Sequence, residues 1–188
     1  ILNLASLFSP IIVYFRRPLG VQSRAFADFC PAITIECGKP HLADSANHAM
    51  NFIETCLNMD SLLCSPPSNG STLYHTIATV KVPAHCSISF GQCEHDICFP
   101  NDLDSMNFCQ INPNTLIART RLRSDIRLEV TDEAGKDVTN KFFIHRGGEI
   151  RSAIPIIPSM LTTQEGIVRQ DCLCYLMERL EGSPSNPC

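Results

Sequence analysis

The sequence lacks the features that mark several broad classes of protein. Its net charge of −4 gives no basic footprint for nucleic acid and no reason to expect binding to an anionic membrane surface. The longest apolar run, near residues 9–15, is too short to span a bilayer. That run also lacks the layout of a signal peptide, because Arg16 and Arg17 follow it instead of preceding it. We therefore expect neither a nucleic-acid partner nor a membrane.

Motifs for several common chemistries are also missing. The chain has no His-Glu-x-x-His pair, no Walker loop, no dinucleotide fingerprint and no Gly-x-Ser-x-Gly elbow. The segment "CEHDIC", residues 93–98, groups two cysteines, a histidine and two acids without the paired Cys-x-x-Cys geometry of structural zinc. A loop with free thiols is favoured there over a metal site. His41 and His48 share one face of a predicted helix, where solvent-facing or capping roles are favoured over metal ligation.

Cysteine, by contrast, is abundant, with 11 residues. One interpretation is a secreted disulfide scaffold, but such scaffolds are short and poor in hydrophobic core, whereas this chain has 188 residues of which 44% are hydrophobic. Several cysteines lie in strand-like runs, among them Cys86, Cys172 and Cys174. The favoured interpretation is therefore buried, reduced thiols in a cytoplasmic protein.

The first third of the chain has the pattern of a small α/β unit. Residues 9–15 predict a buried strand, residues 16–24 a loop, and residues 32–37 a second strand that ends on an acid. Apolar residues recur at three- and four-residue steps over 41–59, which predicts an amphipathic helix. The Pro-, Ser-, Asn- and Gly-rich stretch that follows is the best domain boundary in the chain.

Beyond that boundary the pattern changes to short strands and turns. Residues 73–83 alternate as a half-buried strand does, and residues 132–137 predict a turn between strands. Residues 141–157 predict a strand, a turn at Arg146-Gly147-Gly148-Glu149, and a second strand. The predicted domains are residues 1–64 (α/β), a linker at 65–72, a mostly β domain at 73–182, and a tail at 183–188.

The acid that closes the predicted strand is Glu36, which is followed by Gly38. Ligands collect outside the carboxyl ends of strands in α/β domains, so a half-buried carboxylate there is suited to proton transfer. The other interpretation is an edge acid that pairs with Lys39 or an arginine. The residues alone leave both open.

The stretch "SRAFADFCPAITIECGKP", followed by "LADSANHAMNFIETCL", resembles the zinc carboxypeptidase-like family that contains succinylglutamate desuccinylase and aspartoacylase. That family carries an Arg, a Pro, a β run that ends in Glu-x-Gly, and then an Ala-Asp helix. The segment "LYHTIATVKVP" resembles the strand that opens the family's β domain, and "FPNDLDSMNFCQINPNTLIAR" resembles its Asn-Pro segment. The resemblance implies the C-terminal part of a mixed-sheet catalytic domain followed by a smaller, mostly β domain.

The resemblance also implies a mechanism, in which zinc activates a water, a glutamate takes its proton, and the glutamate returns the proton to the leaving amine. By position that glutamate is Glu36. Arg24 is the closest match to the arginine that binds a substrate carboxylate, with Arg16 and Arg17 as rivals. The implied partner is a small amide or peptide substrate that bears a carboxylate.

The chain departs from the family pattern in one respect. The family's zinc ligands lie upstream of this strand, and no histidine precedes His41. We therefore expect this chain to be the C-terminal part of a zinc-dependent amide hydrolase, with apolar surface in residues 1–60 that is covered by the missing N-terminal half or by another copy in a homo-oligomer. The alternative is a non-catalytic, β-rich carboxylate-binding module that retains the fold without metal.

Overall fold

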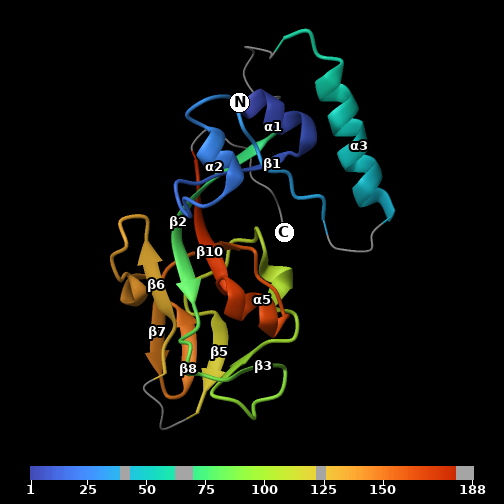
Figure 1. The fold of residues 1–188 in the computed structure, drawn as a ribbon. Helices are drawn as coiled ribbons and strands as arrows, with labels where there is room; N and C mark the ends of the chain where they lie inside the picture. The colour runs from blue at the N-terminus through green and yellow to red at the C-terminus, as the bar shows by residue number, and fades with distance from the viewer. Residues whose placement is uncertain (39–42, 62–69, 122–125, 181–188) are drawn as a thin grey trace. The chain divides into compact units, whose positions relative to one another are not determined.

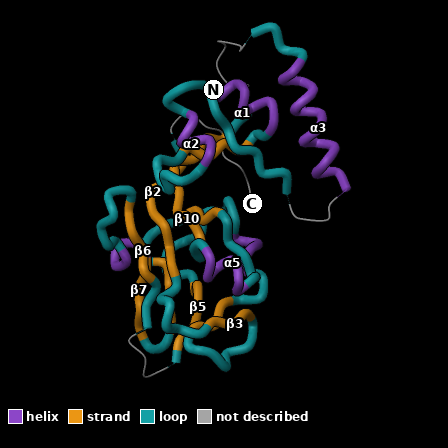
Figure 2. Tube along the Cα trace, in the orientation of Figure 1, coloured by secondary structure: helices purple, strands orange, loops and turns teal. Residues whose placement is uncertain are grey.

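A computed structural model describes residues 1–38, 43–61, 70–121 and 126–180. The chain divides into two compact units, the first formed by residues 1–74 with the segment that begins at Arg179, and the second by residues 75–178. Together they have a mixed α/β fold with two sheets and few helices (Figures 1 and 2). Of the predicted connections, residues 65–69 of the linker and the tail at 183–188 lie outside the described residues.

The first unit is built from short elements: α1 (Leu2–Phe8), β1 (Ile11–Tyr14), α2 (Gln22–Phe26) and α3 (Ala43–Leu57). The structure confirms the strand predicted at residues 9–15 and the helix predicted at 41–59, although β1 is half-buried or exposed and not buried, and α1 and α2 were not expected. In this unit Phe8 is buried against α3, where its ring packs on His48 at 4.3 Å and edge-on against Phe52 at 5.2 Å between centroids.

The predicted strand over residues 32–37 is wrong. Residues 31–38 have no strand assignment in the structure. Exposure still alternates along the segment, because Thr34 and Glu36 are exposed while Ile35 and Cys37 are half-buried. A β strand needs a neighbour to bond its backbone groups, and within the described residues no strand pairs with this one.

Strand β2 (Thr72–Lys81) passes from the first unit into the second. Its even-numbered residues from Thr72 to Val80 are buried, and the odd-numbered residues between them are half-buried. This alternation is the one that the sequence predicts, because successive side chains of a strand point to opposite faces. The unit boundary falls inside this strand, between Tyr74 and His75.

The regular elements of the second unit are mostly short strands, drawn orange in Figure 2 and joined by loops. Its remaining elements are β3 (Ile88–Phe90), β4 (Ile97–Phe99), η1 (Leu103–Met106), β5 (Leu116–Thr120), β6 (Glu129–Asp132), α4 (Thr139–Phe142), β7 (Phe143–Arg146), β8 (Glu149–Ser152), β9 (Ile157–Ser159), α5 (Glu165–Gln170) and β10 (Cys174–Arg179). One sheet has the order β1-β2-β10-β9, and β6 also pairs with β2. The other sheet has the order β3-β4-β5-β8-β7.

The hairpin β7–β8 confirms the turn that the sequence predicts at residues 146–149. Arg146 pairs with Glu149, and the two residues between them, Gly147 and Gly148, have φ values of 61° and 77°. A two-residue hairpin turn of this kind needs positive φ at both central positions, which glycine adopts without steric cost. Figure 1 shows the two strands side by side.

A single apolar cluster joins the two sheets of the second unit. Its most deeply buried large members are Ile97, Phe99, Leu103, Leu128, Ile150, Leu173 and Leu176. Buried polar groups at its edge are satisfied, since Thr139 Oγ1 accepts from the Val130 N–H at 2.9 Å. Among the described residues no helix is long and apolar enough to cross a membrane.

Candidate functional site

Glu36, the carboxylate expected to transfer a proton, lies exposed near the end of the unpaired segment 31–38. Gly38 follows it with φ at 96°, a left-handed conformation that lets the chain turn away at once. A Cβ at Gly38 would meet the Ser45 hydroxyl at 3.4 Å, so the turn also lies close to the first turn of α3. Glu36 is therefore carried on a segment without regular secondary structure, between α2 and α3.

Arg24, the expected carboxylate-binding residue, lies on α2 and is partly exposed. Its guanidinium lies 3.5 Å from the Asp28 carboxylate one helical turn later. Its neighbour Ser23 accepts a hydrogen bond at 2.9 Å from the Thr34 hydroxyl. This bond ties the helix that carries Arg24 to the segment that carries Glu36.

The rival arginines have other contacts. Arg16 donates from Nε to the Tyr14 hydroxyl at 3.1 Å, and both it and Arg17 are exposed beyond β1. The contact between Ser23 and Thr34 therefore favours Arg24 as the guanidinium for this site.

The first unit exposes most of the large apolar side chains that are exposed in the described residues. They are Ile1, Leu7, Tyr14, Leu19, Phe26, Phe29, Met50, Ile53 and Leu57, with Phe29 at 86% and Leu57 at 80% exposure. On α3 the half-buried stripe includes Ala49, Phe52 and Cys56, whereas the apolar side chains of Met50, Ile53 and Leu57 are exposed. The apolar surface expected in residues 1–60 is thus present, and it extends over the outer face of α3.

The cysteine-rich segment 93–98 is not a loop with free thiols, which corrects that expectation. Cys93 and Cys98 form a disulfide, and Cys109 is disulfide-bonded as well. The expectation of buried, reduced thiols is confirmed for Cys86, Cys172 and Cys174, which are free and buried, but not for Cys30, which is free and exposed. Throughout the described residues, no three His, Cys, Asp or Glu side chains gather as a metal site would require.

The second unit holds a charged cluster that the sequence analysis did not single out. His75 on β2 lies between two carboxylates, with Nε2 at 3.2 Å from Glu133 Oε1 and Nδ1 at 3.2 Å from Glu178 Oε1. Because the carboxylates meet opposite nitrogens of the ring, they do not converge on one point as metal ligands do. The imidazole instead links the turn after β6 to the end of β10.

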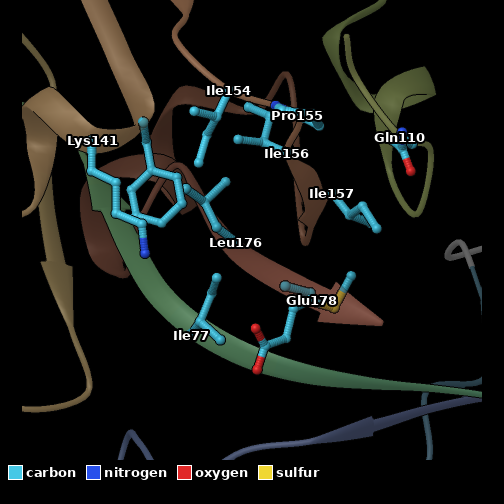
Figure 3. A pocket seen from close by; sticks show the side chains of 11 residues that line it. Ile77, Gln110, Lys141, Ile154, Pro155, Ile156, Ile157, Leu176 and Glu178 are labelled. Carbon is cyan, nitrogen blue, oxygen red and sulfur yellow. The ribbon is translucent and has the colours of Figure 1, made fainter. Parts of the chain in front are cut away.

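Glu178 also borders a cavity of about 270 Å³ in the same unit (Figure 3). Its wall is apolar and comes from β2, α4, β10 and the residues before β9: Ile77, Phe142, Ile154, Ile156 and Leu176. Gln110, Lys141 and Glu178 are exposed side chains at its edge. An apolar wall with a few polar groups is the usual composition of a small-molecule site.

The cavity follows from the alternation of two strands. His75 and Ile77 share one face of β2, and Leu176 and Glu178 share one face of β10. The contact between His75 and Glu178 shows that these two faces are the same side of the sheet. The alternation of β2 is visible in the sequence, but it does not reveal the cavity, because the rest of the wall comes from segments more than 60 residues away.

Comparisons of this chain with models of known families, with curated proteins and with solved structures find no match. The description of the site therefore rests on the chain's own residues.

Proposed function

We propose that this chain supplies the proton-transferring carboxylate and the carboxylate-binding cation of a zinc-dependent amide hydrolase. The observation that supports the proposal is the hydrogen bond between Ser23 and Thr34, which holds the helix of Arg24 against the segment of Glu36. The described residues gather no ligand set for zinc, and in this proposal another part of the protein holds the metal. Zinc would supply an activated water there.

The roles of this chain's residues follow from their chemistry. Glu36, which is exposed, accepts a proton from the attacking water and delivers it to the leaving amine. Arg24 binds the substrate carboxylate through its two-pronged guanidinium. The Asp28 carboxylate occupies Arg24 at 3.5 Å, so the substrate carboxylate competes with Asp28 for the same donor. The proposed substrate is an acylated amino acid or a peptide, and a cytoplasmic location stays part of the proposal.

The exposed apolar face of the first unit supports the same proposal in a second way. Phe29 and Leu57 are 86% and 80% exposed, together with the other large apolar side chains of the first unit named above. Exposed apolar surface of this kind marks an interaction site. In the proposed enzyme the zinc-binding half covers this face. A second copy of the chain is the other candidate cover, and it predicts a concentration-dependent dimer of this chain alone.

The experiment is hydrolysis of an N-acylated amino acid by the native protein, purified without chelator and assayed for zinc. Glu36→Gln should lower kcat by about a hundred-fold or more, the usual contribution of a general base, with zinc content unchanged. Glu54→Gln, an exposed acid on α3, is the matched control and should retain activity. Equal activity of the Glu36 and Glu54 variants would overturn the role of Glu36.

The second candidate function is a carboxylate-binding module without metal. It is favoured by the weak, exchangeable partner of Arg24, since Asp28 is 76% exposed and lies in the turn just after α2. Native protein that contains no zinc and hydrolyses no amide, yet binds an N-acylated amino acid in a manner that Arg24→Lys weakens, would select this function.

A further inference from the structure

The cavity beside Glu178 belongs to the second unit and lies outside the proposed hydrolase site. We propose that it binds a free apolar α-amino acid, of which leucine is the probe. The inference goes beyond the proposed function and depends on none of its residues. It rests on three observations: the size of the cavity, the apolar wall, and the two opposite charges at the edge.

The size of the cavity limits the ligand to a small molecule. A volume of about 270 Å³ holds on the order of ten non-hydrogen atoms, taking roughly 30 Å³ for each, as for one water in the liquid. The wall is formed by branched aliphatic side chains and one ring, with Phe142 at 3% and Leu176 at 1% exposure. Such a wall favours a branched aliphatic side chain over a polar one.

A cation stands at one end of this cavity. Lys141 lines it, and the ammonium lies 5.0 Å from the centre of the Phe142 ring. This cation–π contact restrains a side chain that would otherwise sample many rotamers. Figure 3 shows Lys141 at the opposite end of the view from Gln110, with the isoleucines of the wall between them. The ammonium is therefore the natural partner of the ligand's carboxylate.

An anion stands at the edge of the same cavity. Glu178 uses Oε1 for His75 at 3.2 Å, and its second oxygen is available to accept a hydrogen bond from a ligand ammonium. Glu178 and Lys141 together bring no net charge to the site, so a zwitterion matches it better than an ion of either sign. An apolar α-amino acid carries an ammonium and a carboxylate on one carbon, and its apolar side chain projects from that carbon.

The two carboxylates of the cluster differ in their relation to the cavity. Glu133 contacts His75 Nε2 but does not line the cavity. Glu178 contacts His75 Nδ1 and also lines the cavity. Loss of either carboxylate removes one contact of His75. A ligand in the cavity would depend on Glu178 alone.

The experiment is a titration of the full chain with L-leucine, followed by the methyl NMR signals of its isoleucines. Saturable shifts are expected at Ile77, Ile154 and Ile156, with a dissociation constant on the order of 1 mM for a ligand of this size. Leucine amide and 4-methylpentanoate, which lack the carboxylate and the ammonium respectively, should each bind about ten-fold more weakly. Absence of saturable shifts at these methyl groups up to tens of millimolar leucine would overturn the proposal.

Two matched pairs of variants locate the binding. Lys141→Met should weaken leucine binding about ten-fold or more, and Lys136→Met, an exposed lysine in the turn after β6, should not. Glu178→Gln should weaken it similarly, whereas Glu133→Gln should leave it unchanged. Equal effects of the two glutamate variants would mean that the cluster acts only on the fold, and the assignment of Glu178 would be wrong. Hydrolysis by the Glu36 variants is independent of all four changes, so the two proposals fail separately.

Discussion

Ser87 and Asp96 hold each other through three hydrogen bonds. The Ser87 N–H and hydroxyl both donate to Asp96 Oδ2, at 2.8 Å and 2.7 Å, and the Asp96 N–H donates to the Ser87 hydroxyl oxygen at 3.1 Å. Each residue immediately precedes a strand of the parallel pair β3–β4, in which Ile88 lies opposite Ile97. Parallel strands joined by a short connection have no hairpin to fix their register, so this pair of residues fixes it.

The first prediction concerns this contact. The hydrogen bonds from Ser87, first from its hydroxyl and then from its backbone, lower the pKa of Asp96 below the ordinary value of 3.8. The unfolded chain therefore binds the proton more readily than the folded one. The stabilisation is present above pH 3.8 and is lost as the pH falls through the lowered pKa of the folded state. Asp96→Asn should reduce the midpoint of urea unfolding at pH 7 and should flatten the acid side of its pH profile.

A double-mutant cycle with Ser87→Ala checks the assignment, because the two losses should add to more than the loss in the double variant. Asp102→Asn, an exposed acid at the start of η1, is the control and should keep the acid profile of the unmodified chain. An Asp96→Asn profile that parallels this control below pH 4 would contradict the assigned role.

The second prediction concerns His145 on β7, whose Nε2 accepts a hydrogen bond from the Leu128 N–H at 3.2 Å. Burial, and then the charge of Arg127, lower the pKa of His145 below 6.5. The unfolded chain binds this proton first as the pH falls. The stability of the chain is therefore intact above pH 6.5 and declines as the pH falls from there to the lower pKa of the folded state.

His145→Gln should remove this decline, since an amide oxygen can accept from the Leu128 N–H and does not titrate in this range. The measurement is the urea midpoint at half-unit steps of pH between neutral and mildly acidic conditions. His85→Gln, at an exposed histidine, serves as the control and should keep the decline. If both variants show the same slope, His145 is not its source.

The third prediction tests the core that joins the two sheets. Leu128 is fully buried, so Leu128→Ala should lower the free energy of unfolding by about 2–5 kcal/mol through lost burial and the cavity left behind. Ile144→Ala, on a side chain that is 47% exposed, should change it by less than about 1 kcal/mol. The measurement is denaturant unfolding followed by circular dichroism. Comparable losses for the two variants would show that the core of the second unit lies elsewhere.

Local patterns in the sequence were enough to predict β2, α3 and the β7–β8 hairpin. The alternation from Thr72 to Val80 and the Gly147-Gly148 turn are set by residues close together in the chain. The segment 31–38 has the same β-rich composition, but a strand depends on a partner that the composition does not specify. The pattern thus predicted its alternating exposure and not its pairing.

The candidate site divides in the same way. Glu36 and Arg24 could be singled out from neighbouring residues, but the Ser23–Thr34 bond that relates their segments could not. The cavity could not be predicted at all, because Ile77, Phe142 and Leu176 are far apart in the chain and meet only in the folded second unit. The Cys93–Cys98 disulfide was missed for a related reason, since a count of cysteines does not determine which of them pair.

The last prediction concerns the free thiols. Burial, followed by the charge of Asp171, raises the pKa of Cys172 from 9.0 to about 12, and burial raises that of Cys174 well above its ordinary value. Only the thiolate reacts with alkylating reagents, so ionisation alone should slow labelling of Cys172 about a thousand-fold near pH 8.

Cys30 is exposed and should react first. Timed alkylation of the native chain, read by peptide mass spectrometry, measures both rates. Cys30→Ser should remove the fast phase, and denaturant should bring Cys172 and Cys174 to the rate of Cys30. Labelling of Cys172 as fast as Cys30 in the native chain would show that Cys172, just before β10, is not buried as the structure has it.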